Sequence, residues 1–248
     1  MNLRRVSWEL KFALWLVVAF VALNLLHYAC YRDLGHIFLW NLTSLAFLPV
    51  SVLVVTLFVE RMLAAREREQ RLRKTSMLVG VFFSAVGTRL LARCASWDPA
   101  PGPLREAFGS PHAWERFAPA QAQQVLAAHP YALAPDAAQL RDLQELLGAQ
   151  RDLLLRLLEN PILLEHESFT DLLRAVFHLA EELSFRGDCA QLPPADLQHL
   201  AGDTKRVYGQ LIREWVNYLV TLRRDYPYLF SLAVRTNPLA EHPSAIVP

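Results

Sequence analysis

Cysteine is scarce in this chain of 248 residues. The three thiols, Cys30, Cys94 and Cys189, lie far apart and form no C-x-x-C pair. This spacing excludes zinc-ribbon and dithiol redox motifs. Few, scattered cysteines are typical of a reducing compartment, in which disulfides do not persist.

Motifs for nucleotide and acyl chemistry are missing as well. The chain has no Walker loop, no G-x-G-x-x-G and no G-x-S-x-G, so neither nucleotide binding nor serine hydrolysis is indicated. We therefore expect no cofactor. The formal net charge of +1 comes with no concentrated basic face, so we expect no nucleic-acid partner. No alternating strand pattern occurs, which favours an all-α fold.

Two long apolar runs dominate the first sixty residues. No Lys, Arg, Asp or Glu interrupts Phe12–Tyr28 or Ile37–Val59. As helices they would span about 26 Å and 35 Å, which brackets a hydrocarbon core of about 30 Å. The runs predict a two-helix transmembrane hairpin over residues 1–60, with spans at about 12–28 and 37–59. A cleaved signal peptide is the alternative, but no small-x-small pattern ends the first run.

Charges around the two runs predict their orientation. Arg4, Arg5 and Lys11 precede the first span, whereas Arg32 is the only basic residue of the loop at 29–36. A basic segment follows the second span, so the positive-inside rule places both termini in the cytoplasm. The expected location is the inner membrane, as a multi-pass protein. The Ala-, Leu- and Arg-rich composition suggests a bacterial source.

Two amides interrupt the apolar runs at matching depths. Asn24 lies four residues before the outer end of the first span, and Asn41 lies four residues after the outer start of the second. Because an uncompensated amide is costly in lipid, we expect these side chains to hydrogen-bond across the hairpin.

Residues 61–97 are expected to form a helical stalk. Its first part holds six basic residues against two acidic ones, and the basic residues are Arg61, Arg66, Arg68, Arg71, Arg73 and Lys74. These six residues are candidates for contact with anionic lipid headgroups, and the bilayer is therefore an expected partner. The alternative is a solvated helix whose charges only set the topology.

A third apolar run, Met77–Leu91, follows the basic residues. Arg89 interrupts it and leaves about a dozen apolar residues, too few to span a bilayer. The run is expected to be a buried core helix or an interfacial segment. Small residues recur along it at Gly80, Ser84 and Gly87, a spacing that lets another helix approach closely.

The rest of the chain divides into a Pro-rich linker or irregular loop at 98–119, in which a short helix could form around His112–Phe117, and a C-terminal helical bundle at 120–248. Helical apolar periodicity predicts helices at about 136–159, 169–185 and 194–224. Short connections favour antiparallel neighbours. We therefore expect an antiparallel cytoplasmic bundle of three or four helices.

Histidine and carboxylate residues gather on the second of these predicted helices. The candidates for acid–base chemistry are His166, Asp171, His178 and Glu182, and those for a metal ion are His166, His178, Glu181 and Glu182. A weaker set follows on the next helix, namely Asp196, His199, Asp203 and Lys205. The alternative for both sets is a solvated face held by i,i+3 and i,i+4 charge pairs.

Aromatic residues concentrate near the C-terminus, in YPYLFSLAVRTNP at Tyr226–Pro238. Candidate docking residues for a protein partner are Tyr226, Tyr228, Phe230 and Arg235. The alternative is that this tail packs back onto the bundle and covers its core.

Three stretches carry a family resemblance: VFFSAVG at Val81–Gly87, LLEHESFTDLLRAVFHLAEEL at Leu163–Leu183, and the tail. With them the chain resembles a group of uncharacterised prokaryotic membrane proteins that have an N-terminal hairpin. The group often has Glu where Ala85 stands here, which weakens any role for that position. The resemblance implies the architecture and carries no assigned activity.

Taken together, these features predict a non-enzymatic membrane-anchored scaffold or signal-transducing adaptor that binds a protein partner or a second copy of itself. The first alternative is a membrane-tethered enzyme or metal-binding protein that uses the His and carboxylate residues. The second is a small oligomeric channel.

Overall fold

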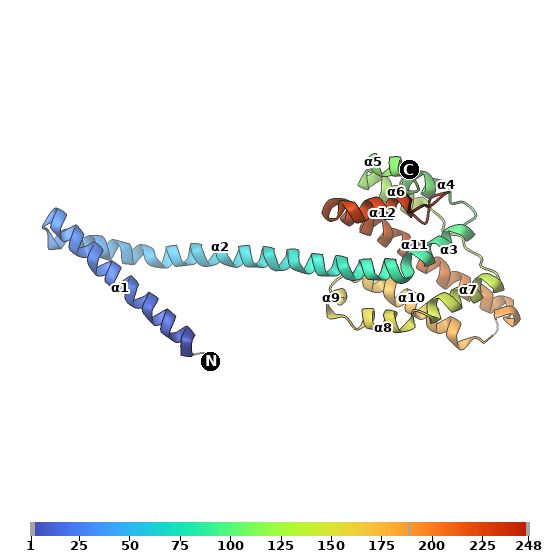
Figure 1. Ribbon diagram of the computed structural model, residues 1–248, viewed down its shortest axis with the longest axis horizontal. Helices are drawn as coiled ribbons and strands as arrows, with labels where there is room; N and C mark the ends of the chain where they lie inside the picture. Colours follow the sequence, from blue (N-terminus) through green and yellow to red (C-terminus); the bar gives the residue numbers. More distant parts are fainter. Residues whose placement is uncertain (1–2, 188, 247–248) are drawn as a thin grey trace. The chain divides into compact units, whose positions relative to one another are not determined.

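The computed structural model describes residues 3–187 and 189–246, and in this part of the chain it contains helices and no strand (Figure 1). The chain divides into two compact units, Met1–Arg68 and Glu69–Pro248. The elements are α1 (Leu3–Tyr31), α2 (Leu34–Phe82), η1 (Phe83–Gly87), α3 (Thr88–Trp97), α4 (Gly102–Phe108), α5 (Pro111–Glu115), α6 (Pro119–Ala128), α7 (Ala137–Gly148), α8 (Arg151–Leu158), α9 (Pro161–Leu164), α10 (Glu167–Phe185), η2 (Cys189–Gln191), α11 (Pro194–Asp225) and α12 (Pro227–Arg235).

A tight turn joins α1 to α2 in the first unit. Arg32 has a φ of 51°, in the left-handed region, and its backbone N–H donates to the carbonyl of Tyr28 at 2.8 Å. The side chain of Asp33 then accepts from the backbone N–H of Gly35 at 2.8 Å and so satisfies one of the first amides of α2. Helical structure therefore continues closer to the turn than the loop expected at 29–36.

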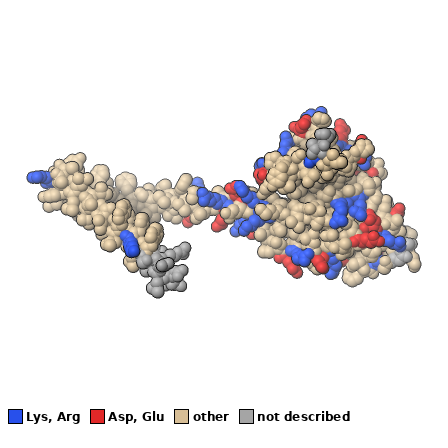
Figure 2. Space-filling view, viewed as in Figure 1, with Lys and Arg blue, Asp and Glu red and all other residues tan. Residues whose placement is uncertain are grey.

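The surface of the first unit is apolar along most of its length. Figure 2 shows α1 and the adjoining part of α2 as almost uninterrupted uncharged surface. In the described chain, two helices are long and apolar enough to cross a membrane, and the apolar window of each is 0% buried. By length and composition alone, both helices therefore qualify as membrane spans.

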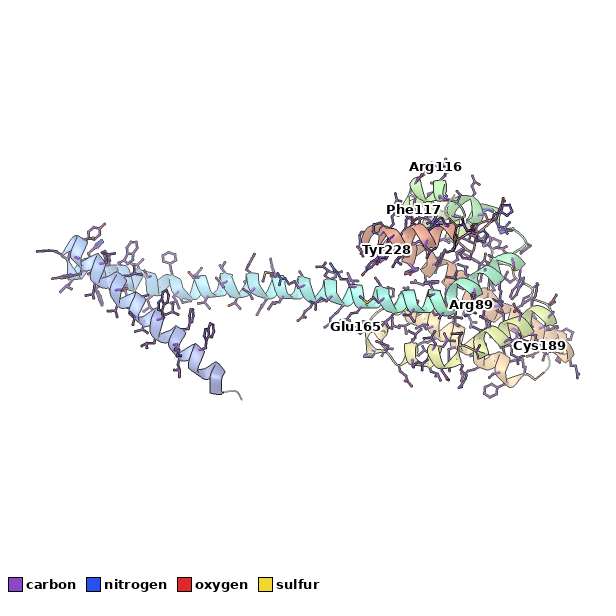
Figure 3. The ribbon with its side chains drawn as sticks, viewed as in Figure 1. Arg89, Arg116, Phe117, Glu165, Cys189 and Tyr228 are labelled. Atoms are coloured by element: carbon purple, nitrogen blue, oxygen red, sulfur yellow. The ribbon has the colours of Figure 1, made fainter. Side chains whose placement is uncertain are left out.

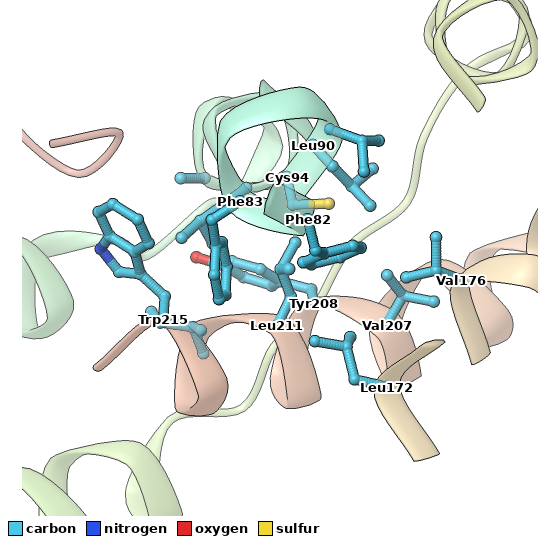
Figure 4. Close-up of a cluster of buried hydrophobic side chains, with 14 of the residues drawn as sticks. Phe82, Phe83, Leu90, Cys94, Leu172, Val176, Val207, Tyr208, Leu211 and Trp215 are labelled. Carbon is cyan, nitrogen blue, oxygen red and sulfur yellow. The ribbon is translucent and has the colours of Figure 1, made fainter. Parts of the chain in front are cut away.

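The third apolar run lies in the core of the second unit. Its buried side chains are Val79, Phe82, Phe83, Val86, Leu90 and Leu91. Figure 4 shows Phe82 and Phe83 above α11, close to Tyr208, Leu211 and Trp215. The ring centroids of Phe83 and Trp215 are 5.2 Å apart. The run is therefore a buried core helix rather than an interfacial segment.

Two glycines of this run are covered by aromatic rings. A Cβ atom on Gly87 would lie 2.6 Å from Cε1 of Phe82 and 2.7 Å from Cδ1 of Phe83. On Gly80 it would lie 3.2 Å from the hydroxyl of Tyr218 on α11. Gly87 stands at the end of the π-helical turn η1, so the small residue lets both rings fold back over the backbone.

The helices α10 and α11 pack against each other at the centre of the second unit. The contacts between them run antiparallel, from Arg186 with Asp196 at one end to His178 with Asp203 further along. α7 and α8 pack on α10, whereas α3 and α12 pack on α11. The expectation of an antiparallel helical domain is thus met, and each helix turns its apolar stripe inward.

Residues 98–119 differ from the expected linker. They form α4 and α5 and bury Leu104, Phe108 and Trp114, whose indole N–H donates to the carbonyl of Phe108 at 2.9 Å. Prolines begin α5 and α6 and stand in the first turn of α4. At these positions the missing N–H costs nothing, because the first amides of a helix have no intrahelical partner. The prolines therefore mark helix starts rather than a linker.

Other boundaries also shift. The expected helix at 136–159 is divided into α7 and α8 by a break after Gly148, and α7 begins with a reciprocal cap between Asp136 and Gln139. The second unit begins at Glu69, so it takes in the end of the stalk and residues 98–119 together with the expected bundle at 120–248.

Candidate functional site

Two histidines and two carboxylates meet between α10 and α11. We call His178, Glu182, His199 and Asp203 the His–carboxylate cluster. The Nε2 atom of His199 lies 3.4 Å from Oδ2 of Asp203 and 3.6 Å from Oε2 of Glu182. The Nε2 atom of His178 lies 3.7 Å from the same Asp203 oxygen and 3.9 Å from Oε1 of Glu182. Each imidazole thus faces both carboxylates.

The local sequence explains this convergence. His178 and Glu182 are four residues apart on α10, and His199 and Asp203 are four residues apart on α11. Residues at this spacing lie on one face of a helix, one turn apart. Because α10 and α11 are antiparallel neighbours, the two pairs lie opposite each other.

Burial is uneven within the cluster. The Asp203 side chain is 5% exposed, whereas the imidazoles of His178 and His199 are 49% and 53% exposed. Oδ2 of Asp203 is buried and has no hydrogen-bond partner. A buried carboxylate oxygen without a donor is costly, so this atom is the least satisfied point of the site.

Arginines occupy the outer oxygens of the cluster. Arg206 contacts Oδ1 of Asp203 at 3.1 Å, and Arg186 donates to Oε2 of Glu182 at 2.5 Å. Arg186 also donates to both carboxylate oxygens of Asp196. Its hydrogen bond lowers the pKa of Glu182, and the bond to Asp196 raises the pKa of the Arg186 guanidinium. Glu182 therefore stays ionised at neutral pH.

Imidazole and carboxylate groups at this spacing suit proton transfer or metal ligation. As they stand, the side chains do not close around an ion: among the described residues no group of three or more His, Cys, Asp and Glu is arranged to hold a metal.

The other candidates on α10 lie outside the cluster. His166 is the N-cap residue, and its Nδ1 accepts from the backbone N–H of Phe169 at 3.4 Å. Asp171 pairs with Arg174 at 3.4 Å, and Glu181 lies 3.8 Å from Arg151. The structure therefore brings together His178 and Glu182 and separates His166, Asp171 and Glu181 from them.

A second polar cluster is fully buried. Oδ2 of Asp98 lies 2.7 Å from Nε2 of His129 and accepts from the Tyr208 hydroxyl at 2.9 Å. The other carboxylate oxygen accepts from the backbone N–H of Ala100 at 3.0 Å. The side chains of Asp98 and His129 are 0% and 1% exposed. This network joins the loop before α4, the end of α6 and the middle of α11, and no motif in the sequence pointed to it.

The aromatic tail forms α12 and divides between core and surface. Tyr226 and Phe230 pack against the hydrophobic core, and the Phe230 ring lies 5.8 Å from that of Trp114. Tyr228 is 72% exposed, and Figure 3 shows it at the edge of the domain. Arg235 donates to the carbonyl of Ala245 at 2.5 Å. Among the four docking candidates, Tyr228 is thus the one that faces solvent fully.

The basic residues of the stalk are exposed in both units. Arg71 pairs with Glu165 at 2.7 Å, and Arg73 pairs with Glu69 at 2.7 Å. The remaining candidates for headgroup contact, which are also exposed, are Arg61, Arg66, Arg68 and Lys74.

The two amides of the first unit contact each other. Nδ2 of Asn41 donates to Oδ1 of Asn24 at 2.8 Å. Nδ2 of Asn41 also donates to the backbone carbonyl of Ile37, and Nδ2 of Asn24 donates to the backbone carbonyl of Phe20, each four residues earlier in the chain. The hydrogen bond between the two side chains therefore links α1 to α2 within an otherwise apolar surface.

Comparison with known proteins places the whole architecture in one family. Residues 71–235 match the family model described as "Uncharacterized protein MJ1433, C-terminal helical domain", and residues 3–63 match "MJ1433, N-terminal helical domain". The Uncharacterized protein MJ1433 of Methanocaldococcus jannaschii is 40% identical over 226 residues, which cover 91% of each chain. This relative is archaeal, so the comparison lends no support to a bacterial source. No solved structure matches the chain. The chain therefore belongs to the MJ1433 family, whose members combine an N-terminal and a C-terminal helical domain.

Proposed function

We propose that the chain is a membrane-anchored scaffold or adaptor. The first unit crosses the cytoplasmic membrane as a helical hairpin, and the second unit offers a helical domain to a protein partner in the cytoplasm. The observation that carries the proposal is the bare apolar surface of the first unit, where the window of each long helix is 0% buried.

The energy of this apolar surface argues for lipid. Between residues 12 and 59, more than 20 Leu, Val, Phe and Trp side chains are at least 39% exposed. Removing such a side chain from water is worth on the order of 1 kcal/mol even for partial burial, so together they amount to tens of kcal/mol. A folded domain has a net stability of only about 5–15 kcal/mol. A bilayer is the surrounding that removes this cost.

Charge supports the proposed orientation. The turn between the helices holds Arg32 as its single basic residue, whereas exposed Arg61, Arg66 and Arg68 follow the second apolar run. Basic residues are retained on the cytoplasmic side of a membrane. Both termini and the second unit then lie in the cytoplasm, and the basic residues lie at the level of anionic headgroups.

The docking face that we propose lies on α12. Tyr228, Leu229 and Leu232 are 72%, 39% and 44% exposed. Positions i, i+1 and i+4 share one face of a helix, so these side chains make a small apolar stripe beside the core. Isolated exposed apolar residues need no explanation, but a stripe on a short helix suits the apolar side chains of a partner protein.

Membrane extraction tests the anchor. The full-length chain is expected to stay in the membrane pellet after washing with alkaline carbonate and to be released by detergent. Release by carbonate alone would show that the first unit is not inserted in lipid and would overturn the proposal.

Site-specific photocrosslinking tests the docking face. A photoreactive phenylalanine at Tyr228 is expected to form one discrete adduct in cells, and Leu232→Lys is expected to abolish it by placing a charge in the stripe. The matched control is the same probe at exposed Lys205 on α11, which should form no adduct. No adduct at Tyr228, or the same adduct at both positions, would contradict the docking face.

A second candidate function is metal binding by the tethered domain. The specific observation that favours it is the His–carboxylate cluster, in which a buried carboxylate oxygen lacks a hydrogen-bond donor. A small oligomeric channel has no comparable support among the described residues.

A further inference from the structure

We propose that the His–carboxylate cluster binds a single divalent transition-metal ion of the Zn²⁺ type. The ligands are Nε2 of His178, Nε2 of His199 and Oδ2 of Asp203, with Glu182 as the fourth. This inference goes beyond the scaffold function and does not depend on it.

The spacing of the donor atoms carries the proposal. The four separations between imidazole nitrogens and carboxylate oxygens are 3.4, 3.6, 3.7 and 3.9 Å. Metal–ligand bonds of about 2.0–2.2 Å in a tetrahedral site place neighbouring donors about 3.3–3.6 Å apart. A direct hydrogen bond would instead bring such atoms to about 2.7–3.2 Å. The four separations are thus longer than hydrogen bonds: two lie within the range of a tetrahedral site, and the other two exceed it by about 0.1–0.3 Å.

Asp203 provides the second, independent observation. Its side chain is 5% exposed, and its Oδ2 points between the two imidazoles without a hydrogen-bond donor. Oδ1 of the same carboxylate is held by Arg206 at 3.1 Å. One oxygen is thus oriented by a neighbour and the other is left for a ligand, an arrangement common around protein-bound metals.

Glu182 resembles Asp203 in having one carboxylate oxygen held by an arginine and the other directed toward an imidazole. Arg186 holds its Oε2 at 2.5 Å, and Oε1 faces His178 at 3.9 Å. The Arg186 guanidinium thereby orients this carboxylate and leaves Oε1 on the side of His178 for a ligand. Two carboxylates with Asp196 beside them outweigh the two arginines in charge, so the site as a whole attracts a cation.

Closing the site needs movement of side chains only. The described residues do not yet form a closed metal arrangement, and the separations exceed the tetrahedral values by up to a few tenths of an ångström. The imidazoles of His178 and His199 are about half exposed, so they are free to turn inward. Two imidazoles and two carboxylates suit Zn²⁺ or Co²⁺ more than Ca²⁺ or Mg²⁺, which prefer oxygen ligands alone.

Metal titration of the untagged full chain in detergent micelles tests the inference. After treatment with a chelator and its removal, the chain is expected to bind one Zn²⁺ per molecule in competition with a chromophoric chelator. Co²⁺ is expected to give the intense visible absorption of a four-coordinate site. His199→Ala and Asp203→Asn should each weaken Zn²⁺ binding at least tenfold. The control His112→Ala removes a histidine that is 83% exposed and distant from the cluster in sequence, and it should leave binding unchanged.

Thermal unfolding separates loss of the site from loss of the fold. Because Asp203→Asn preserves the shape of the side chain, the apo variant should unfold at a temperature close to that of the apo wild type. Saturating Zn²⁺ should raise the unfolding temperature of the wild type and not that of this variant. A stoichiometry near zero for the folded wild type, or equal weakening by His112→Ala and His199→Ala, would overturn the proposal.

Discussion

The buried network around Asp98 is expected to be a main source of stability for the second unit. Its carboxylate takes three hydrogen bonds, from His129, Tyr208 and the backbone of Ala100, at 2.7–3.0 Å. Tyr208→Phe removes one of them and leaves a buried carboxylate oxygen with one donor fewer. A hydrogen bond to a charged group contributes about 1.5–3 kcal/mol, so the free energy of unfolding should fall by about that amount.

Two further variants provide losses in the free energy of unfolding with which the loss for Tyr208→Phe can be compared. Asp98→Ala leaves the buried donors of His129 and Tyr208 without an acceptor, at about 1–3 kcal/mol each, which makes about 2–6 kcal/mol together. Tyr131→Phe is the matched control, because its hydroxyl donates to the uncharged carbonyl of Leu126 at 2.8 Å from a half-buried ring. Its loss should cost about 0.5–1.5 kcal/mol. The expected order of cost is therefore Asp98→Ala, then Tyr208→Phe, then Tyr131→Phe.

Urea unfolding of the full chain in detergent micelles, followed by tryptophan fluorescence, measures these differences. Trp114 and Trp215 are both buried in the second unit, so their emission reports its unfolding. With an m value of about 2–3 kcal/mol per molar urea, Tyr208→Phe should lower the midpoint by about 0.5–1.5 M at unchanged slope. A midpoint change no larger than that of Tyr131→Phe would refute the importance assigned to the charged hydrogen bond.

Three further predictions concern the hairpin, the aromatic core and high pH. In a double-mutant cycle in mixed micelles, Asn24→Leu and Asn41→Leu should show a coupling energy of about 0.5–2 kcal/mol, and strict additivity would contradict an energetic role for their hydrogen bond. Gly87→Ala should destabilise the second unit by about 1–3 kcal/mol in the urea assay, because two phenylalanine rings occupy the space for a Cβ atom, and wild-type stability would refute this. Burial raises the pKa of Cys94 from 9.0 to about 12 and also raises the pKa of Tyr208. The unfolded chain therefore loses these protons at a lower pH than the folded chain. The free energy of unfolding should fall above about pH 9, by about 1.4 kcal/mol per pH unit for each such group. Tyr208→Phe should make the decrease of this free energy with pH less steep above about pH 10, and an unchanged pH dependence would contradict this.

Apolar periodicity was sufficient to predict the long helices. The stripes around Leu172 and Leu211 predicted α10 and α11 within a few residues, because each helix buries one face and exposes the other. The short connection after Arg186 likewise predicted that they are antiparallel. The break after Gly148 was not predicted, because the leucine stripe continues across it and only tertiary packing requires the change of direction.

The high proline content of residues 98–119 led to the prediction of a linker there, whereas the segment forms short helices. Five prolines and two glycines at 98–119 are typical of a linker, yet three bulky side chains of this segment lie in the core. Whether a proline starts a helix or continues a loop depends on the apolar residues after it, here Leu104, Phe108 and Trp114. Composition alone does not carry that information.

The sequence predicted the two halves of the His–carboxylate cluster but not that they come together. His178 with Glu182 and His199 with Asp203 were each recognisable as pairs at i,i+4 spacing, but as separate sets. Only the pairing of α10 with α11 joins them. The signal that points to this pairing is the match between the two motifs across a short connection, with Arg186 and Asp196 closing the near end. The Asp98 network gave no such signal, because its members are 31 and 110 residues apart.

Cysteine labelling tests the proposed membrane topology most directly. Cys30 is exposed near the turn between α1 and α2, whereas Cys94 and Cys189 are buried. A membrane-impermeant maleimide should therefore label Cys30 in intact cells stripped of their outer envelope, and Cys30→Ser should abolish the labelling. In the Cys30→Ser background, Lys205→Cys in the second unit should react only after permeabilisation. Labelling of Cys30 only in permeabilised cells, or of Lys205→Cys in intact ones, would contradict a hairpin that holds the helical domain in the cytoplasm.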